Sequence, residues 1–216
     1  MYGLPLSTEI KKQLSKKAIY AKFALKPSQR ESFDADVARM DIMAVVSPST
    51  VPALGIGTEV KEFYVVAVQL KRKDYEVKNL LLLFRLIPQK MVLALQFAQE
   101  TQFVIEHTQL ITSAWMPTEE AQLPLSGLNI DTAWENLVKS IGQITVEAGH
   151  TLTEQIAVNE QRAKLSAQIA ILKRKMANER QPRKKRAIYE EIKKLVGTQR
   201  VALNTSHEDS QRVAFE

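Results

Sequence analysis

Seven basic residues in two short runs near the C-terminal end have the type and spacing to bind a polyanion. The runs flank a break at Gln181-Pro182, and residues 171–200 contain 11 Lys and Arg against 3 Asp and Glu. This density of positive charge can neutralise several phosphates and bind nucleic acid in a salt-sensitive way. Because Lys and Arg also occupy solvated faces of ordinary helices, a purely solubilising role is the alternative. The seven residues are Lys173, Arg174, Lys175, Arg183, Lys184, Lys185 and Arg186.

A second constellation, Asp41 with Gln69-x-Lys71, would suit phosphodiester hydrolysis. In the restriction-endonuclease-like fold, a carboxylate and a Glu/Gln-x-Lys motif on adjacent strands hold Mg²⁺ and position a water. Gln69 would offer its amide oxygen to the metal, and Lys71 would orient the water. No Pro-Asp dipeptide precedes the strand, Asp41 also suits a helix end, and the substitute acids Glu59 and Glu62 have the wrong spacing. A divergent or inactive nuclease is therefore an alternative prediction, with Mg²⁺ as a cofactor only in that case.

The remaining residues offer no constellation with the spacing of metal ligands or of a nucleophile and its base. His107, His150 and His207 lie far apart in the sequence, so we expect no metal site. The sequence lacks cysteine, which excludes thiolate ligands and a cysteine nucleophile. Gly55-x-Gly57 lacks the Lys-Ser/Thr pair of a phosphate-binding loop. These observations favour a protein that is not an enzyme.

Charge is distributed unevenly along the 216 residues. Residues 1–150 contain 16 basic and 16 acidic residues, so residues 151–216 supply the entire formal net charge of +6. A hydrophobic content of 45% with 25% charged residues is that of a soluble globular protein. The N-terminus has no secretory signal pattern, and the longest apolar run, Leu80–Phe84, cannot span a bilayer. We therefore expect a cytoplasmic protein with no membrane partner, in keeping with the lack of cysteine.

Apolar runs predict the strands of a mixed sheet that would carry Asp41 and Gln69. Residues 60–71 form the clearest strand, since β-branched and aromatic residues dominate it. A helical pattern that ends at Pro88 separates this strand from the next, and a right-handed crossover would make the two strands parallel neighbours. Residues 99–102 are predicted to form a turn. The predicted strands span residues 42–46, 60–71, 90–97, 103–107 and 110–116.

Capping residues and apolar stripes predict the helices that surround this sheet. Residues 7–9 open the first helix, whose apolar face carries Ile10 and Leu14. Asp74 and Asp131 are suited to cap the two helices that pack on the sheet. The other predicted helices are a short one at residues 18–24 and one that begins at Pro27.

After residue 150 the pattern changes to two helices with narrow apolar seams. Apolar residues spaced four and three apart form one seam before Pro182 and another after it. Because Pro is tolerated in the first turn of a helix, Pro182 is predicted to begin the second helix, and Gly197 to end it. An antiparallel coiled-coil hairpin is the expected result. The seam residues are Leu165, Ile169, Leu172, Met176, Ile188, Ile192 and Leu195.

We predict the α+β fold class, with a mixed β-sheet and packed helices in residues 1–148. The helical hairpin follows in residues 149–197, and the polar, weakly patterned residues 198–216 are predicted to be disordered. A hairpin with so short a seam is marginal in water. We therefore expect its apolar face to be completed by its own domain, by a second copy of the chain or by another protein.

Five short motifs follow one another in a characteristic order along the chain. They are Gly3-Leu4-Pro5-x-Ser7-Thr8, Lys16-Lys17, Gln69-Leu70-Lys71, Ile87-Pro88, and Leu128-Asn129-Ile130-Asp131 with Trp134-Glu135-Asn136-Leu137. Together they resemble an uncharacterised prokaryotic family, the domain of unknown function four-three-nine-one, over most of the chain. In that family the strand commonly ends in Glu-x-Lys, whereas Gln69 stands at this position here.

Members of that family are often encoded beside helicases, methyltransferases and restriction-type subunits of phage-defence islands. The resemblance therefore implies a defence-associated accessory protein, and it brings no catalytic residues with it. We predict a non-enzymatic adaptor that binds nucleic acid, or a partner such as a helicase, methyltransferase or restriction-type subunit, through the basic hairpin. The divergent nuclease and a purely structural interaction or homodimerisation module are the alternatives.

Overall fold

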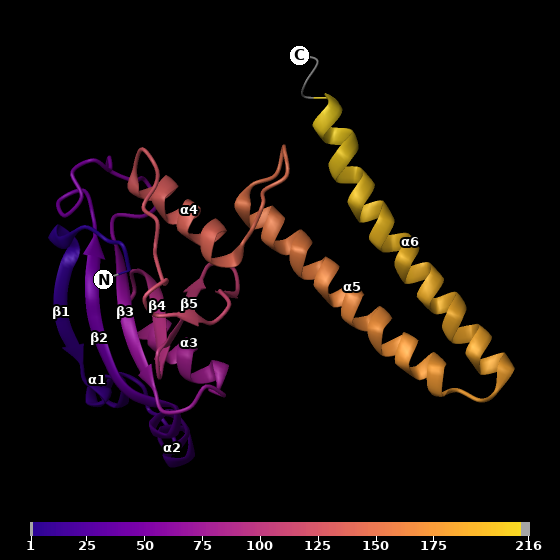
Figure 1. Ribbon diagram of the computed structural model, residues 1–216, viewed down its shortest axis with the longest axis horizontal. Coiled ribbons are helices and arrows are strands. Elements are labelled where there is room, and N and C mark those ends of the chain that lie inside the picture. The colour runs from indigo at the N-terminus through magenta and orange to yellow at the C-terminus, as the bar shows by residue number, and fades with distance from the viewer. Residues whose placement is uncertain (1, 213–216) are drawn as a thin grey trace. The chain divides into compact units, whose positions relative to one another are not determined.

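The chain folds into two compact units, Met1–Ile144 and Thr145–Glu216. The structure is a computed structural model that describes residues 2–212, with side-chain surroundings described for residues 2–198. The first unit has the predicted α+β fold, and the second consists of two long helices that pack against each other. Figure 1 shows the strands side by side and the two long helices folded back on each other. Within the described residues, none of the helices combines the length and the apolar character needed to cross a membrane.

A mixed sheet of seven strands forms the centre of the first unit. The strand order is β1-β2-β3-β4-β5-β6, and β7 pairs with β5. As predicted, β3 and β4 are parallel neighbours joined through a helix, whereas the other strand pairs are antiparallel. The strands are β1 (Glu9–Leu14), β2 (Val37–Val46), β3 (Phe63–Leu70), β4 (Lys90–Phe97), β5 (Glu100–Glu106), β6 (Leu110–Thr112) and β7 (Met116–Pro117).

Helices cover both faces of this sheet. On one face α1 (Lys16–Lys22), α2 (Pro27–Asp36) and α3 (Val77–Leu86) bury apolar side chains against strand residues such as Val68 and Leu95. On the other face α4 (Ile130–Gly142) contacts the sheet, and the ring of its Trp134 lies 5.4 Å from the ring of Phe63. Because side chains alternate along a strand, the odd-numbered residues of β3 face α4 and the even-numbered ones face α1, α2 and α3.

The first element differs from its prediction. Residues 7–9 were expected to open a helix, but a 3-10 turn (Leu6–Thr8) leads directly into the edge strand β1. Only Ile10 and Leu14 gave the helical spacing, and Ile10 is 48% exposed. Hydrogen bonding to β2 outweighs such a weak local preference, because pairing satisfies the backbone of the whole segment. A register shift between Glu9 and Lys12 interrupts that pairing.

Two predicted capping residues have other roles. The carboxylate of Asp36, on α2, accepts a hydrogen bond from the backbone N–H of Glu76 at the start of α3, so Asp74 is not the cap. Asn129 caps α4, whereas Asp131 accepts hydrogen bonds from the backbone of residues 58–60 in a distant loop. Both carboxylates therefore join segments that lie far apart in the sequence, which local patterns do not show.

The predicted turn at residues 99–102 is also wrong, since β5 begins at Glu100. The chain instead reverses at Ala98, which has a positive φ of 53°. Thr101 and Gln102 are buried inside the strand, and the Gln102 amide is bonded to Tyr75 and to the carbonyl of Ser113. Polar residues can thus form a buried strand when tertiary partners satisfy their hydrogen bonds.

The second unit contains α5 (Leu152–Asn178) and α6 (Pro182–Arg212). Pro182 begins α6 as predicted, but Gly197 does not end it, because the helix continues to Arg212. The disorder predicted for residues 198–216 stays a prediction: residues 198–212 are described as part of α6, and residues 213–216 lie outside the described part. A single glycine in a helix interior costs only about 1 kcal/mol, so a helix can continue through it.

Candidate functional site

The closed end of the hairpin is formed by the last turns of α5, a three-residue connection and the first turn of α6. Thr151 caps α5, where its side chain accepts a hydrogen bond from the N–H of Glu154. Ile169 of α5 and Ile192 of α6 are buried, and the other predicted seam residues are half-buried. The two helices pack against each other, and the chain reverses between Asn178 and Pro182.

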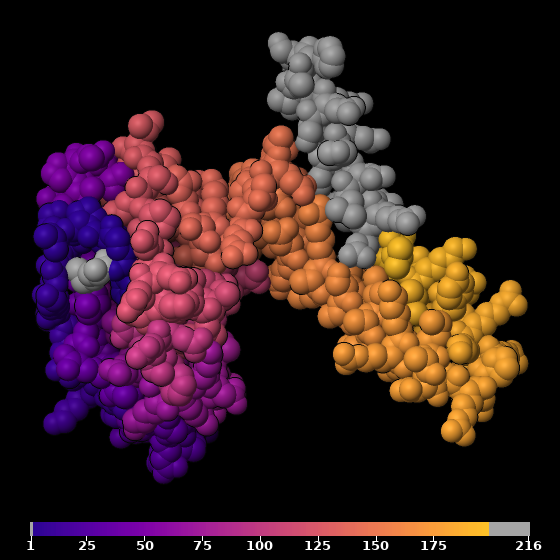
Figure 2. Space-filling model, viewed as in Figure 1, coloured from indigo at the N-terminus to yellow at the C-terminus, as the bar shows by residue number. Residues whose placement is uncertain are grey.

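Eight cationic side chains gather at this closed end, and all of them are exposed. Seven belong to the two predicted runs, and the eighth is Arg180 in the connection. Figure 2 shows long side chains that project from this end, where the colour passes from orange to yellow. We call this set the cationic tip: Lys173, Arg174, Lys175, Arg180, Arg183, Lys184, Lys185 and Arg186.

Within the described residues, no side chain of the cationic tip forms an ion pair. The ion pairs described in the second unit join Arg162 to Glu147 and Lys164 to Glu160 instead. Glu179, the acid nearest in sequence, accepts a hydrogen bond from the backbone N–H of Gln181. Among the described residues, the positive charge of the tip is therefore presented to solvent without an ion-paired acid.

The start of α6 is electrostatically unfavourable for the helix itself. Its first turn contains no acidic residue, and residues 183–186 are all basic. The N-terminus of a helix already carries about half a positive elementary charge, so cations here repel it. Anions are stabilised at the same place. A bound polyanion would relieve both the mutual repulsion of the side chains and their repulsion by the helix dipole.

The structure brings two of the three predicted nuclease residues close together. Asp41 lies opposite Ala67 on the neighbouring strand, and Arg39 lies opposite Gln69. Since paired residues and alternate residues share a face, Asp41 and Gln69 are diagonal neighbours on one face of the sheet. Sequence analysis missed Arg39, although its position two residues before Asp41 on the same strand places the two side chains together.

The described contacts of Asp41 and Lys71 are with neighbouring groups of the first unit. The guanidinium of Arg39 donates to both carboxylate oxygens of Asp41, at 2.7 and 2.9 Å. Lys71 lies just beyond β3, and its charge contributes, after the hydrogen bond from Lys16, to lowering the pKa of Asp34 on α2. The backbone N–H of Lys71 donates to the carbonyl of Asp36 at the end of α2.

The histidines were predicted to form no metal site. Burial, followed by the charge of Lys90, lowers the pKa of His107. His150 lies 3.2 Å from the amide oxygen of Gln155, and His207 lies outside the described side chains. Within the described part of the chain, no three His, Asp or Glu side chains are grouped as metal ligands.

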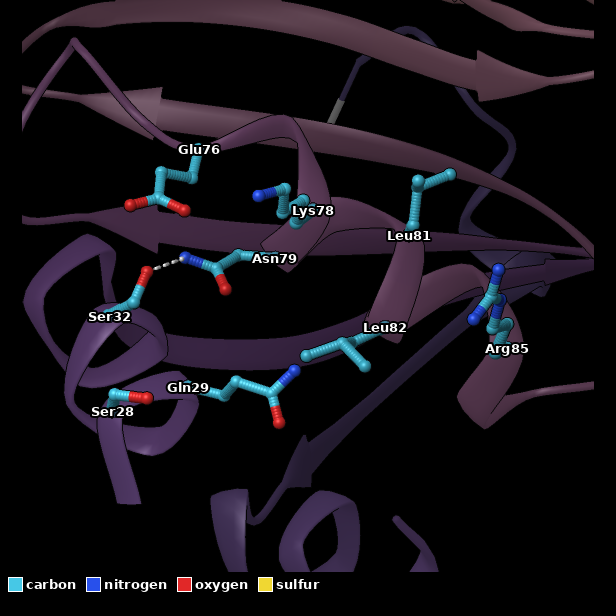
Figure 3. Close-up of a pocket in the computed structure, with 9 residues that line it drawn as sticks. All are labelled: Ser28, Gln29, Ser32, Glu76, Lys78, Asn79, Leu81, Leu82 and Arg85. Carbon is cyan, nitrogen blue, oxygen red and sulfur yellow. Dashed lines mark hydrogen bonds between the residues drawn. The ribbon is translucent and has the colours of Figure 1, made fainter. Parts of the chain in front are cut away.

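A hollow of about 460 Å³ lies between α2 and α3, and its lining includes Ser32 and Asn79. Figure 3 shows the side-chain amide of Asn79 directed toward the hydroxyl of Ser32, to which it donates at 3.1 Å. The same amide also donates to Asp36 at 2.7 Å. These polar groups are therefore engaged in connecting α2 with α3.

Asp36 is the centre of this connection, and its side chain is only 1% exposed. Burial by itself raises the pKa of the carboxyl group. Hydrogen bonds from the N–H of Glu76, from Asn79 and from Arg72 outweigh burial and leave the pKa below its ordinary value. The carboxylate is thus held in its charged form by Glu76 and Asn79 at the start of α3 and by Arg72 shortly after β3.

Comparison with known proteins assigns the chain to a family. The family described as "Domain of unknown function (DUF4391)" matches residues 2–197. The chain therefore belongs to this family, and the match includes the sheet unit, α5 and the first half of α6. No curated protein and no solved structure matches the chain.

Proposed function

We propose that this protein is a non-enzymatic accessory protein that binds nucleic acid through the cationic tip. One observation carries the proposal: eight exposed cations are concentrated at the closed end of a helical hairpin without an ion pair among the described residues. Regularly spaced phosphates are the anions that such a concentrated set of Lys and Arg neutralises best. The binding would depend on backbone phosphates and would carry little sequence preference.

The partners proposed for this activity come from the family resemblance. A role in phage defence, beside a helicase, methyltransferase or restriction-type subunit in the cytoplasm, would place the cationic tip next to nucleic acid that the partner processes. In this proposal the tip supplies affinity and the partner supplies chemistry. The packing of α5 against α6 keeps the two basic runs together at the closed end of the hairpin.

The decisive experiment measures binding to a short DNA duplex by fluorescence anisotropy between about 50 and 200 mM salt. The test variant carries Lys184→Glu, Lys185→Glu and Arg186→Glu together. We expect this variant to lose duplex binding at about 200 mM salt; any binding that remains at about 50 mM salt should have a slope of log K against log salt that is smaller by about 0.9 for each phosphate contact removed. The melting temperature should not decrease, because acids are favourable in the first turn of a helix.

A matched control carries the same change of charge in the first unit. Lys12, Lys17 and Lys61 are exposed there and form no ion pair among the described residues, so each can be changed to Glu. Equal loss of binding in both variants would mean that only net charge matters. Unchanged binding in the tip variant would reject the proposal, and absence of salt-dependent binding by the natural chain would favour a structural interaction module.

A metal-dependent nuclease is the second candidate, favoured by the common sheet face of Asp41 and Gln69. It predicts cleavage of supercoiled plasmid with Mg²⁺ or Mn²⁺ that Asp41→Asn and Lys71→Ala both abolish. Arg39→Ala is the informative partner variant, because it frees both oxygens of Asp41 for a metal. Nicking that survives Asp41→Asn would come from a contaminant and would remove this candidate.

A further inference from the structure

A polar row crosses four strands of the first unit at the carboxyl ends of β3 and β4. Arg39 is paired with Gln69, Gln69 with Gln96, and Gln96 with Thr101. Paired residues project from the same face, so the four side chains form one continuous row on the face that α4 covers elsewhere. In open α/β sheets ligands bind at the carboxyl ends of parallel strands, and β3 and β4 are the parallel pair of this sheet.

Two adjoining hollows lie over this row, with volumes of about 360 Å³ and about 510 Å³. They share Gln96, Thr118 and Glu119 as lining residues. Gln122 lines the first hollow, and Gln69 and Gln99 line the second. Both volumes fall within the range of small-molecule sites. We call the combined hollow the amide cleft, defined by Gln69, Gln96, Gln99 and Gln122.

One of the four side-chain amides is held by a hydrogen bond within the protein, and the other three are available to bind a ligand. The amide nitrogen of Gln96 donates to the hydroxyl of Tyr2 at 2.7 Å. Tyr2 is itself held by an edge-on contact with Phe103, with ring centroids 5.3 Å apart. Among the described residues, the side chains of Gln69, Gln99 and Gln122 form no hydrogen bond. The cleft therefore has a rigid polar centre surrounded by unengaged amides.

The lining of the cleft carries little charge. Among the described residues that line it, Glu119 is the only ionised one. The nearby guanidinium of Arg39 is occupied by Asp41, and Lys73 is occupied by Glu100. A phosphate or carboxylate group would therefore find no free cation among the described lining residues and would face the Glu119 carboxylate. The ligand that fits is neutral, with hydrogen-bond donors and acceptors side by side.

We propose that the amide cleft binds a nucleobase, with adenine as the best match. A primary amide places a donor beside an acceptor, and this pair complements the N7 and N6 groups of adenine. The carboxylate of Glu119 can accept a further hydrogen bond from an exocyclic amino group. The base would come from a nucleoside or from an unpaired nucleotide, and the proposal does not rest on the cationic tip.

Adenosine titrated into the full chain tests this proposal, with EDTA present to exclude metal-dependent binding. The readout is the set of glutamine side-chain amide signals in a ¹⁵N–¹H correlation spectrum, together with calorimetry. We expect the amide signals of Gln69, Gln99 and Gln122 to shift with adenosine and not with ribose. No shift at millimolar adenosine, or equal shifts with ribose, would overturn the proposal.

Variants separate the cleft from the rest of the surface. Gln69→Leu combined with Gln122→Leu keeps the side-chain size and removes the hydrogen bonds, so adenosine should bind at least about tenfold more weakly. Gln89→Leu is the matched control, because Gln89 is exposed just before β4, at the end of that strand opposite the cleft. Equal weakening in both would contradict the assignment. The triple variant of the cationic tip should bind adenosine normally, which distinguishes failure of one site from failure of the other.

Discussion

Acidic residues of the first unit, such as Asp36, Asp41 and Glu100, lie against basic side chains, whereas the cations at the closed end of the hairpin have no such partner among the described residues. In the first unit, charge connects segments and stabilises the fold. At the cationic tip, charge is concentrated where it opposes the helix that carries it. The comparison teaches that charged residues which do not stabilise their own fold are the better candidates for binding.

The largest expected effect on stability concerns the ion-paired residues of the first unit. Asp36→Ala removes a buried carboxylate that receives hydrogen bonds from three residues, so we expect a loss of about 3 kcal/mol in the free energy of unfolding. Urea denaturation measures it. Glu100→Ala is the control, because its pair with Lys73 is about 42–43% exposed and should cost less than about 1 kcal/mol. Similar losses in the two variants would contradict a special role for Asp36.

A second prediction separates the apolar seam of the hairpin from its exposed surface. Ile169 is buried and Ile171 is 54% exposed, although only one residue separates them. Ile169→Ala should reduce the stability of the hairpin by about 2 kcal/mol, whereas Ile171→Ala should change it by less than about 0.5 kcal/mol. Hydrogen exchange of amides in α5 and α6 resolves this local loss. Equal protection in both variants would show that the seam does not hold the helices together.

The pH dependence of stability sharpens the same comparison. Since the pKa of folded Asp36 lies below its ordinary value, its contribution is complete above the unfolded-state pKa of about 3.9. That contribution is lost as the pH falls through the lower, folded-state pKa. Thermal melts from about pH 5 down to about pH 2 should show a steeper acid loss for the natural chain than for Asp36→Asn. If the melting temperatures of both proteins decreased equally with pH, other carboxylates would account for the loss of stability in acid.

The smallest effect on stability is expected at the cationic tip. Lys184→Glu alone replaces a repelled cation with a favoured acid in the first turn of α6, so the melting temperature should stay within about 1 °C or rise slightly. Circular dichroism of the full chain measures this change. A clear decrease would show that Lys184 stabilises the fold, which would weaken the argument that the cationic tip exists for binding.

Sequence patterns predicted the elements whose signals are local and strong. The β-branched run of β3, the apolar run of β4 and the helical pattern between them correctly predicted a parallel pair. The two seams around Pro182 likewise predicted two packed helices. Prediction failed for β1, where two apolar residues at helical spacing were outweighed by pairing with β2.

The candidate sites were predictable to different extents. Seven of the eight cations in the cationic tip were identified because their runs are contiguous in sequence, and Arg180 was missed because it stands alone. The amide cleft could not be identified, since Gln69 and Gln96 become neighbours only through the register of β3 and β4. The pairing of Arg39 with Asp41 required knowledge that β2 is extended at this point.

The sequence by itself determined the separation of a neutral unit from a basic one and the order of the strongest strands and helices. These follow from composition and from short-range periodicity, which need no knowledge of the partner segments. Only the tertiary structure decided that Asp36 joins α2 to α3, that Asp131 holds a distant loop, and that four polar residues align across the sheet. Each of these depends on contacts between residues far apart in the chain, and such contacts are set by the packing of whole elements and the register of strands.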